Sequence, residues 1–173
     1  MNKTTKFICI NGMGIALFVA LSMCLRVPVF ENYYLCLGYI VMTVYCYKFG
    51  VTSGLITGVF GTILYCLLIN GLRGMPGWVI GNIVIAIELG LIFKLTKRLK
   101  KPLLETVIAT IITVEAVAVG ILFAKSLVEC ILYSQPFLIR ISNNIYAFVA
   151  DIVVIVASLP ICRIMEKQKI TLQ

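Results

Sequence analysis

Three acidic side chains interrupt long apolar stretches of the sequence: Glu88, Glu115 and Asp151. An ionised group inside a bilayer is costly, so such residues usually face a cavity, a partner or an ion path. We therefore interpret them either as parts of a binding cavity or as structural partners between helices. A proton relay through Glu115 and Asp151 is a further alternative.

Polar residues recur at helical spacing in the last apolar stretch. Arg140, Asn144 and Asp151 are separated by four and seven residues, and at about 100° per residue they share one helix face. Asn143 flanks this face. The spacing predicts the polar wall of a cavity that opens to the outside. The alternative is a set of hydrogen bonds or ion pairs between helices.

Residues 71–82 form the one long break between apolar stretches that combines Gly, Pro, an Arg and the single Trp. Gly and Pro predict a loop that leads into a helix. Trp78 is typical of a membrane–water boundary. Asn82 follows four residues later and therefore lies on the same helix face. With Arg73 nearby, we expect this segment to form the rim of a cavity that the other helices surround.

Four cations lie on the outer side of the membrane in the six-helix topology described below: Arg26, Arg73, Lys125 and Arg140. The planar guanidinium of Arg matches the geometry of a carboxylate. Several cations around one mouth predict an anionic ligand, with Arg73 and Arg140 as the preferred contacts. The alternative is that these side chains extend from the interface toward water.

The composition predicts one integral membrane domain over residues 1–173, because 61% of the residues are hydrophobic and only 13% are charged. Most cations lie at the ends of apolar segments, so the net charge of +8 does not indicate nucleic-acid binding. The apolar run after the basic N-terminus lacks a clear cleavage site, and we interpret it as a retained helix.

Several chemical functions are excluded by missing residues. The chain has no His, and its seven Cys form no C-x-x-C pair, so no metal or other cofactor is expected. It lacks the G-x-x-x-x-G-K-[ST] phosphate loop, the G-x-S-x-G elbow and H-E-x-x-H. We therefore expect neither an enzyme nor an ATPase, but a membrane subunit that takes its energy from other proteins.

The elements that position these residues are predicted to be six transmembrane helices, with both termini in the cytoplasm. A span needs about 20 apolar residues. Six spans place eleven Lys and Arg residues on the side of the termini and four on the other, which fits the positive-inside rule. The predicted helices cover roughly residues 8–25, 34–47, 51–69, 78–95, 103–128 and 137–165.

The first helix carries Gly12, Ala16 and Ala20 at four-residue spacing. Small residues at this spacing let another helix approach closely in a bilayer. The smooth face is predicted either to pack within this chain or to dock onto a partner subunit.

The chain resembles the substrate-binding S components of energy-coupling factor (ECF) vitamin transporters. The resemblance covers nearly the whole chain. It rests on the chain length, the six helices, the basic cytoplasmic ends and several short motifs in the right order. These are Ala16-x-x-x-Ala20, Leu37-Gly38-Tyr39-Ile40, Phe49-Gly50, the series Gly54, Gly58 and Gly61, and Pro76-Gly77-Trp78 with Gly81-Asn82.

The resemblance implies a transport complex in the cell membrane of a bacterium. Ala16 and Ala20 would contact the transmembrane coupling subunit, and two cytoplasmic ATPase subunits would complete the assembly. The S component would bind a vitamin near the outer face, beneath a lid at Arg26–Leu35, and would topple to deliver it inside. By position, the site would draw on Arg26, Tyr34, Arg73, Trp78, Asn82, Glu115, Arg140, Asn143 and Asn144.

The favoured vitamin is pantothenate, because the Gly71–Trp78 loop resembles that of S components assigned to pantothenate and the outer Arg residues suit an acid. Folate or another vitamin is an alternative within the same family. A stand-alone, proton-coupled carrier of small molecules is an alternative outside it.

Overall fold

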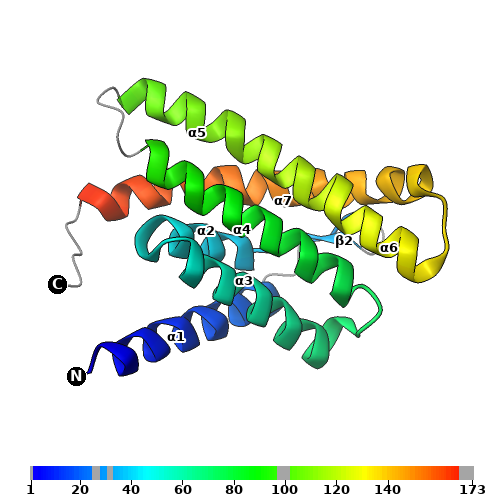
Figure 1. Ribbon diagram of the computed structural model, residues 1–173, viewed down its shortest axis with the longest axis horizontal. Coiled ribbons are helices and arrows are strands. Elements are labelled where there is room, and N and C mark those ends of the chain that lie inside the picture. The colour runs from blue at the N-terminus through cyan, green and yellow to red at the C-terminus, as the bar shows by residue number, and fades with distance from the viewer. Residues whose placement is uncertain (1, 25–27, 31–32, 97–101, 168–173) are drawn as a thin grey trace.

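The computed structural model describes residues 2–24, 28–30, 33–96 and 102–167, and it is built almost entirely of helices (Figure 1). A short antiparallel hairpin joins the first two helices, with Pro28 paired to Tyr34 and Phe30 to Tyr33. In chain order, the elements are α1 (Lys3–Cys24), β1 (Pro28–Phe30), β2 (Tyr33–Tyr34), α2 (Gly38–Phe49), α3 (Val51–Tyr65), the π-helix η1 (Cys66–Asn70), α4 (Met75–Thr96), α5 (Pro102–Val117), the π-helix η2 (Ala118–Lys125), α6 (Ser126–Tyr133) and α7 (Phe137–Lys167).

Within the described residues, five helical segments are long and apolar enough to cross a membrane. They agree with five of the six predicted spans. The remaining one, predicted at 34–47, is α2, whose 12 residues reach only about 18 Å at 1.5 Å per residue. A hydrocarbon core is about 30 Å thick. The five segments are Lys3–Cys24, Val51–Ile69, Met75–Thr96, Leu104–Tyr133 and Phe137–Met165.

The short α2 helix lies among the others instead of forming part of the outer wall. It contacts α1, α3, α4 and α7. Tyr39 and Met42 have no exposed surface, and Phe49 is the one exposed residue of this helix. A Cβ added to Gly58 would lie 2.5 Å from the Met42 sulfur, so this glycine of α3 allows α2 and α3 to pack closely.

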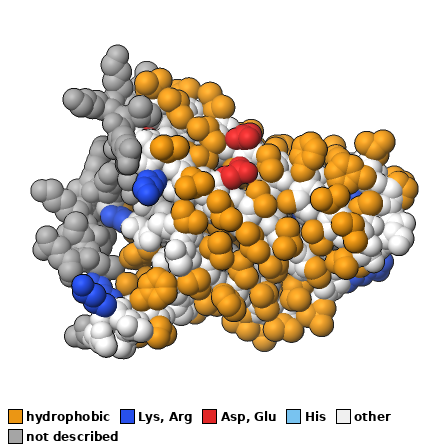
Figure 2. Space-filling view, in the orientation of Figure 1, with side chains coloured by type: hydrophobic (Ala, Val, Ile, Leu, Met, Phe, Trp, Pro, Cys, Tyr) orange, Lys and Arg blue, Asp and Glu red, His pale blue; other side chains and the backbone are white. Residues whose placement is uncertain are grey.

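The two ends of the molecule differ in what they contain. The start of α1, the α2–α3 turn and the end of α7 lie at one end, and the loop before α4 and the α6–α7 turn lie at the other (Figure 1). Apolar side chains cover the face between them (Figure 2). Which end faces the cytoplasm stays a prediction.

The predicted lid at residues 26–35 contains the hairpin, and both of its strands contact α7. The resemblance implied only a lid here and no strands. The segment instead pairs its two halves, which brings the chain back toward the start of α2. Helix α7 is thus close to both the hairpin and α2.

Candidate ligand-binding site

A chain of hydrogen bonds joins α2, α3 and α4 near the loop that precedes α4. The Trp78 indole Nε1 donates to the Tyr39 hydroxyl at 2.8 Å, and that hydroxyl donates to Asn82 Oδ1 at 2.6 Å. Asn82 Nδ2 donates to Thr62 Oγ1 at 2.6 Å and to the Gly58 carbonyl oxygen at 3.4 Å. Trp78 and Asn82 share a helix face, as predicted, and Tyr39 connects them.

The bonding capacity of Asn82 is used within the protein, and the residue has no exposed surface. In the structure it holds the Tyr39 hydroxyl, which in turn accepts from Trp78. The Trp78 ring is partly buried and packs edge-on against Tyr65, with ring centroids 5.7 Å apart.

A second polar cluster joins α6 to α7. Asn144 Nδ2 donates to Ser126 Oγ at 2.9 Å and to Glu129 Oε2 at 3.1 Å. The same carboxylate oxygen lies 3.7 Å from Arg140 Nη1. Asn144 is 2% exposed and Glu129 is 6% exposed, so the cluster is internal. A Cβ on Gly77 of α4 would lie 2.9 Å from Glu129 Cγ, which shows how closely α4 covers this carboxylate.

Tyr133 lies between two of the predicted outer cations. The guanidinium carbon of Arg73 is 5.5 Å from the centre of the Tyr133 ring, and that of Arg140 is 5.1 Å from it. Both distances are within the range of cation–π attraction. The two Arg residues expected to bind an acid are thus engaged by Tyr133, and Arg140 also by Glu129.

Asp151 of α7 and Lys125 of η2 are two further ionisable residues that are not exposed. Asp151 is 7% exposed, and Lys125, the last residue of η2, is partly buried and attracts it electrostatically. The carboxylate also acts on Tyr39 and on Cys36, the residue that follows the hairpin strand by two positions. Burial, with the Asp151 charge as the next cause, raises the pKa of the Cys36 thiol to about 12.

The structure does not bring all the predicted site residues together. Glu115 and Asn143 are exposed, and Glu115 interacts with Glu88 instead of with the clusters above. Figure 2 shows acidic groups on the apolar face. Tyr34, in strand β2, is 39% exposed. Arg26 lies outside the described residues.

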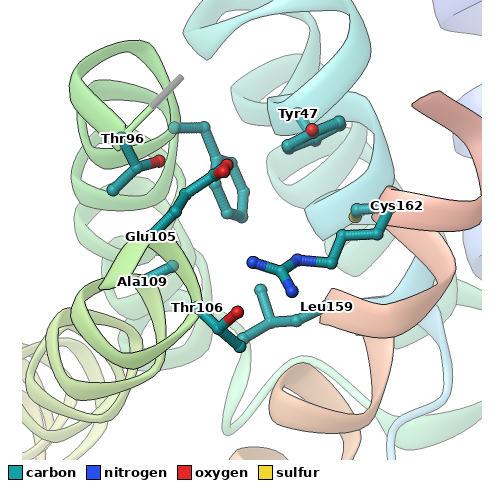
Figure 3. Close-up of a pocket in the computed structure, with 9 residues that line it drawn as sticks. Tyr47, Thr96, Glu105, Thr106, Ala109, Leu159 and Cys162 are labelled. Atoms are coloured by element: carbon teal, nitrogen blue, oxygen red, sulfur yellow. The ribbon is translucent and has the colours of Figure 1, made fainter. Parts of the chain in front are cut away.

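The structure has a small cavity at the end where α7 finishes. Figure 3 shows Glu105 and Thr106 of α5 facing Leu159 and Cys162 of α7 across it. Its volume of about 20 Å³ suits a single water molecule, which needs roughly 10–15 Å³, and not a vitamin. It is lined by Tyr47, Phe93, Thr96, Glu105, Thr106, Ala109, Leu159, Cys162 and Arg163.

The sequence prediction missed Tyr39, Ser126, Glu129 and Tyr133. Ser126 and Glu129 are three residues apart, which places them on one helix face, and this spacing within an apolar run would have indicated them. Tyr39 and Tyr133 carry no such pattern, because aromatic residues are common in membrane helices. Their roles depend on helices far away in the sequence.

The profile of one protein family, described as ECF-type riboflavin transporter, S component, matches residues 2–167. The chain belongs to this family. It is therefore a membrane-integral substrate-binding subunit of an ECF transporter and not an enzyme, as the sequence predicts. A comparison with curated proteins gave no match.

The family assignment supports an S component but does not support the preference for pantothenate. That preference rested partly on outer Arg residues free to bind an acid. In the structure, Arg140 is held by Glu129, and both Arg73 and Arg140 contact Tyr133. A side chain with an internal partner is a poor indicator of an anionic ligand.

Proposed function

We propose that this chain captures riboflavin or a closely related flavin at the end that carries the hairpin and the loop before α4. The observation that carries the proposal is the match of the riboflavin-type S component family over residues 2–167. The ligand would lie among α2, α4, η2 and α7, close to Trp78.

The chemistry of these side chains supports a flavin. Riboflavin combines a flat aromatic ring system with a polyol chain and is uncharged near neutral pH. Such a ligand needs an aromatic surface and hydrogen-bonding groups, and it needs no free cations. Trp78, which is partly buried, offers an aromatic surface, and its indole is held by the Tyr39 hydroxyl. The outer Arg residues are engaged within the protein.

The proposed orientation has both termini in the cytoplasm. The end of the molecule that holds both chain termini is rich in cations, and this excess supports that end as the cytoplasmic one. These cations lie at or near helix ends and are Lys3, Lys6, Lys48, Lys94 and Arg163. The hairpin end then faces outward, where β1 and β2 would cover the ligand as a lid. Tyr34 of β2 remains a candidate contact from this lid.

The coupling subunit is proposed to dock on α1. Gly12, Ala16 and Ala20 are exposed, and α1 uses its other side to contact α2 and α3. A face of small residues suits close approach by a partner helix. Two ATPase subunits on the cytoplasmic side would supply the energy.

Ligand binding by the purified chain tests this function. We expect riboflavin bound to the detergent-solubilised chain to lose fluorescence, and riboflavin to raise the thermal unfolding temperature without ATP. Pantothenate, folate and thiamine serve as comparisons in the same assay. Binding of pantothenate or folate with no response to riboflavin would refute the flavin assignment and leave the family assignment intact.

A further inference from the structure

Helix α4 and the segment formed by α5 and η2 pack along a seam whose alignment is fixed at two points. A Cβ on Gly81 of α4 would lie 2.9 Å from the Gly120 carbonyl oxygen of η2, so the two backbones touch there. Further along, Phe93 of α4 and Ala109 of α5 line the same small cavity. Because the two segments run in opposite directions, the residues between these points can be matched across the seam (Figure 1).

This alignment places Glu88 of α4 opposite Thr113 of α5. Glu88 follows Gly81 by seven residues and Thr113 precedes Gly120 by seven, which is about 10 Å along each helix at 1.5 Å per residue. Residues seven apart share a helix face, so Glu88 lies on the side of α4 that meets Gly120. Thr113 likewise lies on the side of α5 that meets Gly81, between Gly120 and the cavity residue Ala109.

Both residues have a buried oxygen without a hydrogen-bond partner. Glu88 Oε2 and Thr113 Oγ1 each have less than 1 Å² of exposed surface, and no described residue bonds to either atom. Thr113 as a whole is 0% exposed. Buried polar groups nearly always have a partner. Two unpartnered oxygens that face each other across one seam indicate a group between them that binds to oxygen.

Glu115 brings a second carboxylate to this level of the seam. It lies two residues after Thr113, is exposed, and interacts electrostatically with Glu88. Both glutamates lie well inside segments long enough to span a membrane. Within the described residues, the ion pair that is present joins Arg140 to Glu129, and neither carboxylate of the seam takes part in one. Negative charges without a counter-charge at this depth are costly.

We propose that the α4–α5 seam binds a small alkali cation, such as sodium, through Glu88, Thr113 and Glu115. Carboxylate and hydroxyl oxygens are hard ligands that suit hard cations. The ion supplies the positive charge that the two glutamates lack, and it bonds to Glu88 Oε2 and Thr113 Oγ1. Such an ion needs oxygen ligands only, so the absence of His from the chain does not exclude it.

The ligand set favours a singly charged ion over a divalent one. Ca²⁺ takes roughly 6–8 oxygen ligands and Mg²⁺ usually keeps several waters, and a closed seam between two membrane helices offers neither. In the described part of the chain, no group of three or more His, Cys, Asp or Glu side chains could hold a metal ion. The cation would tie α5 to α4, and its binding does not depend on the proposed flavin function.

Thermal unfolding of the full detergent-solubilised chain tests this site, with NaCl replaced by choline chloride at the same concentration. Sodium should raise the unfolding temperature of the wild type by roughly 2–4 °C or more, the size expected when the ion exceeds its Kd several-fold. Equilibrium dialysis with radioactive sodium should show saturable binding of a single ion per chain.

Three variants identify the ligands, and a fourth is the control. Thr113→Val removes the hydroxyl and keeps the shape, and Glu88→Gln removes the buried carboxylate. Each should abolish the sodium-dependent rise in unfolding temperature, and Glu115→Gln should reduce it. Glu105→Gln removes another partly buried carboxylate of α5, one that lines the cavity, and should keep the full response to sodium.

The proposal is overturned if the wild type unfolds at the same temperature in sodium and in choline and binds no sodium in dialysis. A response to Mg²⁺ or Ca²⁺ without one to sodium overturns the assignment of an alkali ion. A full sodium response in Thr113→Val and Glu88→Gln shows that sodium binds elsewhere. Where Glu88→Gln does not fold, Thr113→Val decides alone, because it changes no charge.

Discussion

Asn82 is the residue on which the first hydrogen-bond network depends. Its amide bridges the Tyr39 hydroxyl, the Thr62 hydroxyl and the Gly58 carbonyl without any exposed surface. Removing one partner from a buried network leaves the others unsatisfied, and each unsatisfied group costs about 1–3 kcal/mol.

Asn82→Ala should therefore lower the free energy of unfolding by about 2–4 kcal/mol, since Tyr39 and Thr62 both lose a buried partner. Thermal unfolding in detergent measures this. Asn143→Ala is the matched control, because Asn143 is exposed, and its unfolding temperature should stay near that of the wild type. Equal effects of the two variants would show that the network does not stabilise the fold.

Arg140 and Arg73 both contact Tyr133 but differ in burial. Arg140→Ala leaves Glu129, which is 6% exposed, without its cation, and should destabilise the protein by about 1–3 kcal/mol. Arg73→Ala removes an exposed cation–π contact and should cost at most about 1 kcal/mol.

The same two variants test the ligand's charge. Each substitution should change the affinities for an acidic and a neutral vitamin by the same factor, because both guanidinium groups have partners within the protein. Equilibrium binding with riboflavin and pantothenate measures this. Selective loss of an acidic ligand in Arg73→Ala would restore the anion-site interpretation.

Among the elements, η2 joins α5 to α6 and sets how closely this continuous helical segment packs against α4. It is a π-helix of 8 residues, and π-helical turns in otherwise α-helical segments are frequent at functional sites. Its Gly120 packs against Gly81 of α4, where an added Cβ would be 2.9 Å from a backbone oxygen. A backbone atom cannot move aside as the end of a flexible side chain can.

Gly81→Ala should therefore push α4 away from η2 and weaken flavin binding by roughly tenfold or more, since overpacking typically costs about 1–3 kcal/mol. Gly74→Ala is the control, because a Cβ there would meet nothing within 4 Å. Affinities from fluorescence titration test the pair. Wild-type affinity in Gly81→Ala would mean that this contact does not shape the site.

Apolar length predicted the five long helices well, because a bilayer imposes a nearly fixed span on each. It failed at residues 34–47, since Tyr34 pairs with Pro28 in the hairpin and the helix begins only at Gly38. Helical spacing predicted that Asn144 and Asp151 share one face, and both are buried; that this face lines a cavity stays a prediction. It could not show that Glu115 lies on an exposed face, because that depends on how α5 is rotated against α4 and α7.

At the scale of the whole molecule, the α1 face and the proposed ligand site are separate regions. Ala16 and Ala20 are exposed on α1, and the hydrogen-bonded clusters lie among α2, α3, α4, α6 and α7. Docking and ligand binding should therefore respond to different substitutions.

Ala16→Trp should abolish riboflavin uptake into cells that contain the complete transporter, because a bulky side chain blocks close helix approach. Riboflavin binding by the purified variant should stay unchanged. Ile111→Trp is the control, since Ile111 is 63% exposed on α5, and its uptake should remain normal. Normal uptake with Ala16→Trp would refute docking through this face.

The buried position of α2 has a consequence for how the protein senses its lipid surroundings. A change in bilayer thickness is met by helices that touch lipid, which tilt or adjust their ends. Eleven of the twelve residues of α2 are not exposed, so this helix has almost no acyl-chain contact to adjust. Tyr39 of α2, which holds Trp78 of the proposed site, is thereby insulated from membrane composition, and the surrounding helices can respond to lipid without moving it directly.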